Sequence, residues 1–232
     1  MPPINYRYCH FPPTIVQHAL WLYARFSLSF RDVEDLLAER GIIVSYETIR
    51  RWVAKFGPQI ARRLRHHRRP AHPLWHLDEM FVSIGGKPMY LWRAIDQNGD
   101  ILDVLVQARR NKNAALRLIR KLLKKTGRAP LVLVTDKLKS YAAAVRDLGL
   151  TVRHHQARWK NNRIEGSHVV VRRRERRMQG FRSPGSTQRF LSLHDATYNT
   201  FNTRRHLCHA SDHRERRRRA FDLWNGAARA AA

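Results

Sequence analysis

The sequence predicts a mixed fold class, α+β or α/β, in which an all-α N-terminal domain precedes a domain built on a mixed β-sheet. Apolar residues recur at helical spacing as far as Phe56. From Leu74 the pattern alternates as in strands, and the dipeptides Gly85-Gly86 and Asn98-Gly99 are typical hairpin turns. After Lys112, helical patterns alternate with short apolar runs, an order that forms strand–helix units packed on a sheet.

The N-terminal domain is expected to span residues 1–61 and to contain three helices. The first runs from about Thr14 to Phe26. Ser29 is a suitable N-cap for the second, which ends at Gly41. Ser45 caps the third, whose apolar positions are Ile49, Trp52, Val53 and Phe56.

Two short helices, a break containing Gly41 and a basic third helix favour a helix-turn-helix. The exposed face of the third helix would present Tyr46, Arg50, Arg51 and Lys55 to a DNA groove. The alternative is an ordinary three-helix unit with a solvated basic face. Residues 62–73 (RRLRHHRRPAHP) are interpreted as a basic linker, either a DNA-backbone contact or a tether.

The second domain is expected to span residues 74–205. Strands are predicted at 75–84, 89–96, 101–108, 130–135 and 150–154, and helices at 112–125, 139–148 and 162–177. The apolar run that ends at Thr135 is typical of a central strand covered on both faces. This β-β-β-α-β-α-β-α order is that of the ribonuclease-H-like fold, in which the first and fourth strands are neighbours.

Charge narrows the class of partner. The chain has 232 residues, 45 of them Lys or Arg against 18 Asp or Glu, a net charge of +27. Such an excess costs stability through self-repulsion and favours nucleic acid over small metabolites. Two distant cysteines, Cys9 and Cys208, make neither a disulfide framework nor a zinc site. With no signal peptide or membrane-length apolar stretch apparent, we expect a cytoplasmic protein without membrane contact.

Three scarce acids carry the chemistry. Asp78 lies in the first strand, Asp136 ends the fourth and Glu165 lies on the last helix of the sheet domain. Neighbouring strands would bring the two aspartates together, and three converging carboxylates suit Mg²⁺ or Mn²⁺ and phosphoryl transfer. Asp136 alone could equally be a turn or cap residue. Glu79 should face the opposite side of the sheet, so only Asp78 or Glu79 can face the site. Spacing does not choose between Glu165 and Glu175, which is expected to be an ion-pair partner.

Several segments together resemble a known family. They are SFRDVEDLLAERGIIVSYETIRRWV, WHLDEMFVSIGGKPMYLWRAID, RRNKNAA, VTDKLKSY, RWKNNRIEGSH and RMQGF. They resemble the bacterial insertion-sequence transposases of the DDE superfamily, in the small replicative, cointegrate-forming branch with a retroviral-integrase-like core. The resemblance covers residues 10–205.

The resemblance implies a DNA transposase that cleaves and joins the ends of its element, with Asp78, Asp136 and Glu165 holding two Mg²⁺ or Mn²⁺ ions. It implies that residues 29–56 recognise terminal inverted repeats in double-stranded DNA, and that the protein is a nucleoid-associated homodimer or larger assembly. Its matching blocks assign DNA or active-site support to Lys137, Lys160, Asn161, Asn162 and Arg163. Only 28 residues (137–164) separate Asp136 from Glu165, fewer than is typical of the branch.

Rival interpretations remain open at this point. A non-catalytic DNA-binding protein would explain the helix-turn-helix. A nuclease that only hydrolyses DNA would explain the acids, and an RNA-binding protein would explain the charge but not the acids. Tyr141 and Tyr198 are interpreted as packing residues rather than nucleophiles. The cluster His206, Cys208, His209 and His213 is a weak metal-site candidate, and residues 206–232 are expected to form a solvated, partly disordered basic tail.

Overall fold

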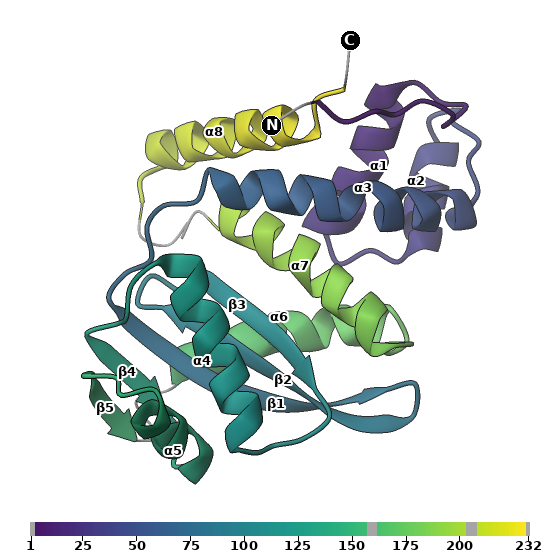
Figure 1. Ribbon diagram of the computed structural model, residues 1–232. Helices are drawn as coiled ribbons and strands as arrows, with labels where there is room; N and C mark the ends of the chain where they lie inside the picture. The colour runs from purple at the N-terminus through teal and green to yellow at the C-terminus, as the bar shows by residue number, and fades with distance from the viewer. Residues whose placement is uncertain (1–2, 157–161, 203–207, 231–232) are drawn as a thin grey trace. The chain divides into compact units, whose positions relative to one another are not determined.

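The computed structural model describes residues 3–156, 162–202 and 208–230 (Figure 1). It divides into two compact units, one of residues 1–68 and 189–232 and the other of residues 69–188. The second boundary falls within α7 (Pro184–Phe201). Among the described residues, no helix combines the length and apolarity needed to cross a membrane.

The helical unit is built on α1 (Pro13–Arg25), α2 (Phe30–Ala38) and α3 (Tyr46–His66). The predicted cap of α2 is present as a full capping box, in which the Ser29 hydroxyl accepts from the Asp32 amide and the Asp32 carboxylate accepts from the Ser29 amide. The side chain of Ser45 caps α3 by accepting from the Thr48 amide. The three helices begin close to where the sequence predicts, and α1 and α2 also end close to the predicted positions.

Helix α3 is longer than expected and includes the first five residues of the predicted linker. Pro58 lies inside it and removes one backbone hydrogen bond. The helix nevertheless continues because Phe56, Ile60 and Leu64 follow one another at four-residue spacing and are all buried. The basic residues around Leu64 had concealed that apolar stripe.

The C-terminal segment is not a disordered tail. Residues 210–228 form α8 (Ala210–Ala228), which packs on α3. Its buried positions are Ala220, Trp224, Ala227 and Ala228, which lie on one helical face. The N-terminal segment closes over its end, where the Ile4 amide donates to the Arg229 carbonyl (2.9 Å) and the Tyr6 hydroxyl to the Ala228 carbonyl (2.8 Å).

The sheet unit contains five strands in the order β3-β2-β1-β4-β5. They are β1 (Leu74–Ile84), β2 (Lys87–Asp96), β3 (Ile101–Gln107), β4 (Val132–Thr135) and β5 (Arg153–Gln156). Strand β1 runs antiparallel to β2 and parallel to β4, so the first and fourth strands are neighbours, as predicted. The Gly85-Gly86 turn between β1 and β2 has both φ angles positive (57° and 78°), a conformation that favours glycine.

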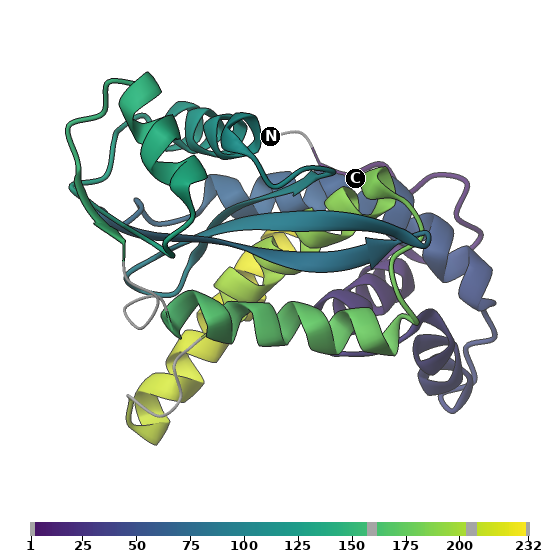
Figure 2. The ribbon, with the colours of Figure 1, turned by 90° about the horizontal axis from the view of Figure 1, so that it is seen from below.

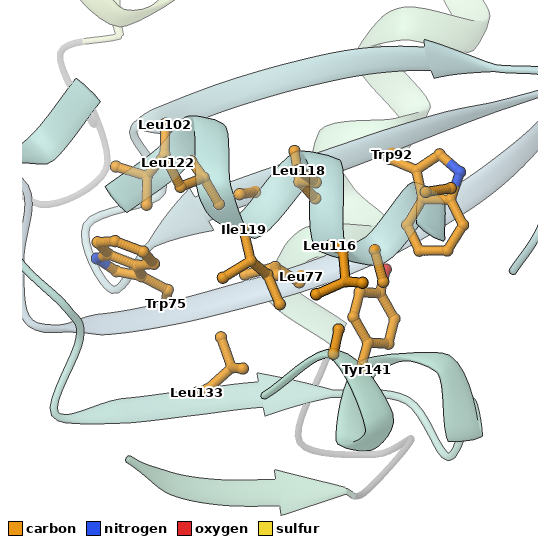
Figure 3. Packing of buried hydrophobic residues seen from close by; sticks show 14 residues of the cluster. Trp75, Leu77, Trp92, Leu102, Leu116, Leu118, Ile119, Leu122, Leu133 and Tyr141 are labelled. Carbon is orange, nitrogen blue, oxygen red and sulfur yellow. The ribbon is translucent and has the colours of Figure 1, made fainter. Parts of the chain in front are cut away.

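Helices cover both faces of this sheet. Figure 2 shows α4 (Lys112–Thr126) and α5 (Lys139–Asp147) on one face and α6 (Asn162–Arg177) on the other. The hydrophobic core lies under α4 and α5, where Trp75, Leu77 and Trp92 from the strands meet Leu118 and Ile119 (Figure 3). The mixed sheet, its strand order and its helices on both faces make this unit a ribonuclease-H-like domain.

Candidate active site

The parallel pairing of β1 with β4 brings two aspartates together. The paired residues end with His76 opposite Val134, so Asp78 and Asp136 each lie two residues beyond the last pair. Within the described part of the chain, Asp78, Glu79 and Asp136 form the group in which one ligand atom from each residue lies within 4.8 Å of the others. Two of the three predicted acids thus meet just beyond the point where the pairing of β1 with β4 ends.

The prediction that only one residue of the Asp78-Glu79 pair can face the site is wrong, because both side chains lie close to Asp136. Alternation along β1 does place Glu79 on the side of Leu77 and α5, opposite Asp78. However, β4 ends at Thr135, so Asp136 lies past the last strand pair, where carboxylates from either face of β1 can approach it. The rule that alternate residues of β1 face opposite sides of the sheet separates their side chains only where β1 and β4 are still paired.

The Glu79 carboxylate is fixed by two neighbours. Its Oε2 accepts a hydrogen bond from the Tyr141 hydroxyl (2.7 Å), and its Oε1 accepts one from Arg110 Nε (2.6 Å). Burial raises the pKa of Glu79, while these two hydrogen bonds lower it. Arg110 also reaches Asp136, with Nη2 3.4 Å from Oδ2. Tyr141 is a packing residue as predicted, edge-on to Trp92, and its hydroxyl has this further role.

Asp78 lies in an environment that disfavours its charge. Burial raises its pKa to about 7, and the negative charges of Glu79, Asp136 and Glu165 contribute to the rise. The carboxyl therefore takes up a proton near neutral pH unless a cation compensates for the neighbouring charges. This is the electrostatic condition in which a divalent cation binds favourably.

Glu165 lies in the first turn of α6 and is exposed. It is close enough to Asp78 to raise that residue's pKa, although it lies outside the tight group that includes Glu79. One turn further along, His168 Nδ1 is 3.8 Å from Asp78 Oδ2. Burial lowers the pKa of His168 to about 3, and the charges of Arg93 and Arg172 add to the effect, so the ring is neutral.

The sequence interpretation had not assigned Arg110 or His168 to the site. Both were within blocks already singled out, Arg110 in RRNKNAA and His168 three residues after Glu165. Helical spacing alone places His168 on the same face of α6 as Glu165. The pairing of Arg110 with Glu79 spans 31 residues and gives no local signal.

The remaining predicted residues occupy two places. Tyr46, Arg50, Arg51 and Lys55 are all exposed on α3, and both arginines pair with Glu47 (2.7 Å from Arg50 and 3.4 Å from Arg51). Lys137 is exposed beside Asp136. Lys160 and Asn161 lie outside the described residues, as do the side chains of Asn162 and Arg163 at the start of α6 and all of His206.

Comparison with known proteins decides the family. A profile described as a DDE domain matches residues 73–204, more than half of the chain and including all three predicted acids. A transposase for the insertion sequence-like element IS431mec of Staphylococcus aureus (strain Mu50 / ATCC 700699) is 30% identical over 201 residues, covering 84% of this chain and 89% of that protein. The chain belongs to the insertion-sequence DDE transposases.

The transposase has further relatives. A Staphylococcus aureus transposase for insertion sequence element IS257 in transposon Tn4003 is also 30% identical over 201 residues, with the same coverage. Among solved structures, the HTLV-2 integrase catalytic core domain in complex with magnesium aligns with a TM-score of 0.43 at 11% identity, covering 58% of this chain and 87% of that one. Family membership makes DNA transposition the function of the transposase, and its acidic group is suited to a divalent metal ion.

Proposed function

We propose that the transposase cleaves and joins DNA at the ends of its insertion sequence by two-metal phosphoryl transfer, with Asp78, Asp136 and Glu165 as the metal-binding residues. The observation that carries the proposal is the convergence of Asp78 and Asp136 just beyond the paired stretch of β1 and β4, with Glu165 near enough to raise the pKa of Asp78. Acidic groups gathered at one place, one of them with its pKa raised to about 7, favour the binding of a cation there.

The donor set fits Mg²⁺ or Mn²⁺. Carboxylate oxygens are hard ligands, and such ions use a few carboxylates together with substrate phosphates. The Asp136 side chain is 26% exposed, which leaves it accessible to an ion. When bound, the two ions supply activation of the attacking oxygen and neutralisation of phosphate charge.

The chain's own residues contribute position and electrostatics. Oδ1 of Asp136 accepts from the Leu138 amide (2.9 Å), which fixes the carboxylate at the start of α5. The neutral ring of His168 packs beside Asp78 without adding a competing positive charge. Water and then the freed 3′-OH would attack in turn, with no covalent bond between DNA and protein.

A cleavage and joining assay on a duplex carrying the element's terminal repeat tests this. Glu165→Gln is expected to abolish joining while retaining DNA binding. Glu175→Gln is the matched control, because it removes the same charge from the same helix and Glu175 pairs with Arg172 (2.8 Å). Loss of joining in the Glu175 variant with activity retained in the Glu165 variant would reverse the assignment. If the wild type binds the repeat but does not react with either ion, the alternative of a non-catalytic DNA-binding derivative is favoured.

We further propose that residues 29–56 bind the terminal inverted repeats through Tyr46, Arg50, Arg51 and Lys55, with Lys137, Lys160, Asn161, Asn162 and Arg163 contacting DNA near the active site. The exposed basic face of α3 supports the first assignment. Both ends of the element must be held together for joining to target DNA, so a homodimer or larger assembly is expected.

The chain contains a matched control for the first DNA assignment. Arg50 and Arg51 pair with Glu47 on α3, and Arg218 and Arg219 pair with Glu215 on α8 at the same three- and four-residue spacing. Replacing Arg50 and Arg51 by Ala should lower affinity for the terminal repeat more than for random DNA. Replacing Arg218 and Arg219 should lower both equally. Equal losses from both double variants would remove sequence recognition from α3.

A further inference from the structure

Glu79 belongs to the acidic group by distance, yet its contacts differ from those of a metal ligand. Its side chain is 1% exposed, and both carboxylate oxygens accept hydrogen bonds, one from Tyr141 and one from Arg110. Tyr141 is itself fully buried in the core under α4 and α5. The Asp136 carboxylate, in contrast, has open access at 26% exposure.

Arg110 lies next to a fixed point of the chain, the start of α4. It immediately precedes Asn111, whose side chain caps α4 by accepting from the Ala114 amide (3.1 Å). Its guanidinium uses Nε toward Glu79 and Nη2 toward Asp136, and the side chain remains 45% exposed. A guanidinium has five N–H donors, so donors remain beyond these two contacts.

We propose that Glu79 is a buried anchor rather than a metal ligand, and that Arg110, which it fixes beside Asp136, binds a phosphate of the DNA strand being cut. This inference rests on the proposed function, because it places the phosphate next to the metal-binding carboxylates. A planar guanidinium whose Nε is fixed by a carboxylate presents its remaining donors in one orientation, which suits phosphate oxygens.

Charge balance supports this division of roles. Without a metal ion, Arg110 is a positive neighbour that Asp136 and Glu79 share. A cation held by Asp136 would compensate that carboxylate in its place, and the hydrogen bond from Arg110 to Glu79 would keep the guanidinium where it is. Arg110 then lies where a phosphate of the substrate brings new negative charge.

Metal binding in the absence of DNA separates anchor from ligand. Binding of Mn²⁺ is followed by electron paramagnetic resonance of the free ion. Glu79→Gln is expected to keep Mn²⁺ affinity within about threefold of wild type, whereas Asp136→Asn lowers it by at least about tenfold. A loss in Glu79→Gln as large as that in Asp136→Asn would overturn the anchor role. Tyr141→Phe is the second variant, because it keeps the buried ring and removes only the donor to Glu79. Its Mn²⁺ affinity should also stay within about threefold of wild type, and a loss as large as that in Asp136→Asn would contradict the anchor role.

The phosphate contact is tested with neutral methylphosphonate groups placed one at a time at the phosphates flanking the scissile one. With natural DNA, Arg110→Ala should slow joining about 10- to 100-fold, the effect of losing one charge-assisted hydrogen bond. At one position the methylphosphonate should slow the wild type by a similar factor and slow Arg110→Ala no further. If Arg110→Ala is slower than the wild type by the same factor on natural DNA and on every methylphosphonate DNA, Arg110 has a structural role and the proposal is overturned.

Two controls separate this inference from the function beneath it. Arg120→Ala removes one exposed charge from α4 and should change joining by less than about twofold, so a comparable loss there would attribute the Arg110 effect to net charge. Asp136→Asn tests the function itself. If Asp136→Asn joins DNA normally, the metal-site proposal fails. If Asp136→Asn is inactive while Arg110→Ala is fully active, only the phosphate-binding role fails.

Discussion

The two faces of the sheet differ in what they bury. The face under α4 and α5 is apolar, with Trp75, Leu77 and Trp92 in its core. The face under α6 also buries apolar residues such as Val82 and Leu91, but it differs in burying polar and charged side chains near Asp78 as well, namely His76 (7% exposed) and Arg93 (0%). Residues alternate between the two along the same strands, since Leu77 is followed by Asp78 and Trp92 by Arg93.

The difference indicates a division between stability and chemistry. The apolar face contributes favourable burial, whereas Asp78 and His168 are held with pKa values far from their ordinary ones. Glu79 lies on the apolar side, and two hydrogen bonds stabilise its charge there. Burial of apolar side chains on one face of the sheet can thus offset the electrostatic cost of Asp78 and His168 on the other face.

The largest expected effect is that of replacing Asp78, on the face of the sheet under α6. Asp78→Asn should reduce joining by at least about 10³-fold, because a proposed metal ligand is lost. The same change should make the metal-free protein more stable at pH 8. The sign follows from the pKa of about 7 in the folded chain against the ordinary aspartate value of 3.8. The folded state binds more protons between those values, so stability falls as pH rises from about 4 to 7 and the full cost, up to about 4 kcal/mol, is present above 7.

Thermal unfolding of both proteins in EDTA at pH 4 and pH 8 measures this. The advantage of Asp78→Asn should be large at pH 8 and small at pH 4. A variant that is less stable than wild type at pH 8 would mean that the charge of Asp78 is well compensated and that the two faces do not differ as described.

Leu77→Ala, one residue away on the apolar face, should have the opposite signature. Leu77 is fully buried, so its truncation should lower the free energy of unfolding by about 2–5 kcal/mol through lost burial and a cavity. Joining activity per folded molecule should stay near wild type. Urea unfolding, with activity normalised to the folded fraction, checks both points, and a loss of activity without loss of stability would contradict the division of roles.

Much of this arrangement was predictable from local patterns. The order of the strands along the chain followed from alternation and turn dipeptides. The pairing of the first strand with the fourth, and with it the meeting of Asp78 and Asp136, followed from the ribonuclease-H-like fold that this order matches. The extension of α3 and the existence of α8 were missed because the dense arginines around Leu64 and before Trp224 suggested solvent. In both segments a few apolar residues at helical spacing outweigh the charges.

The electrostatic partners could not be predicted in the same way. Glu79, Arg110 and Tyr141 come from β1, the segment before α4 and α5, and only the folded sheet brings them together. The choice between Glu165 and Glu175 came from resemblance, and Glu175 does pair with Arg172 as expected. Spacing gives the face of an element, whereas the partner across a fold depends on where neighbouring strands end.

A third prediction concerns metal affinity and pH. Because Asp78, as a proposed metal ligand, must lose its proton to bind a cation, Mn²⁺ affinity should fall by about tenfold for each pH unit below about 7 and level off above it. Calorimetric titration in buffers of different ionisation enthalpy measures both the affinity and the number of protons released. An affinity that is constant from pH 5 to 8 would show that Asp78 is already ionised without metal.

The smallest expected effect, and the most local test of the polar face, is the titration of His168. Burial lowers its pKa from the ordinary value of 6.5 to about 3, so its ring should stay neutral down to pH 5. NMR of the imidazole carbons, assigned with His168→Gln, follows this directly. The unfolded chain binds more protons than the folded one between about 3 and 6.5, so this residue makes stability rise with pH, opposite in sign to Asp78. A midpoint near 6.5 for His168 would mean that water reaches the space under α6. The two faces of the sheet would then differ in which residues they contain, but both would be accessible to water.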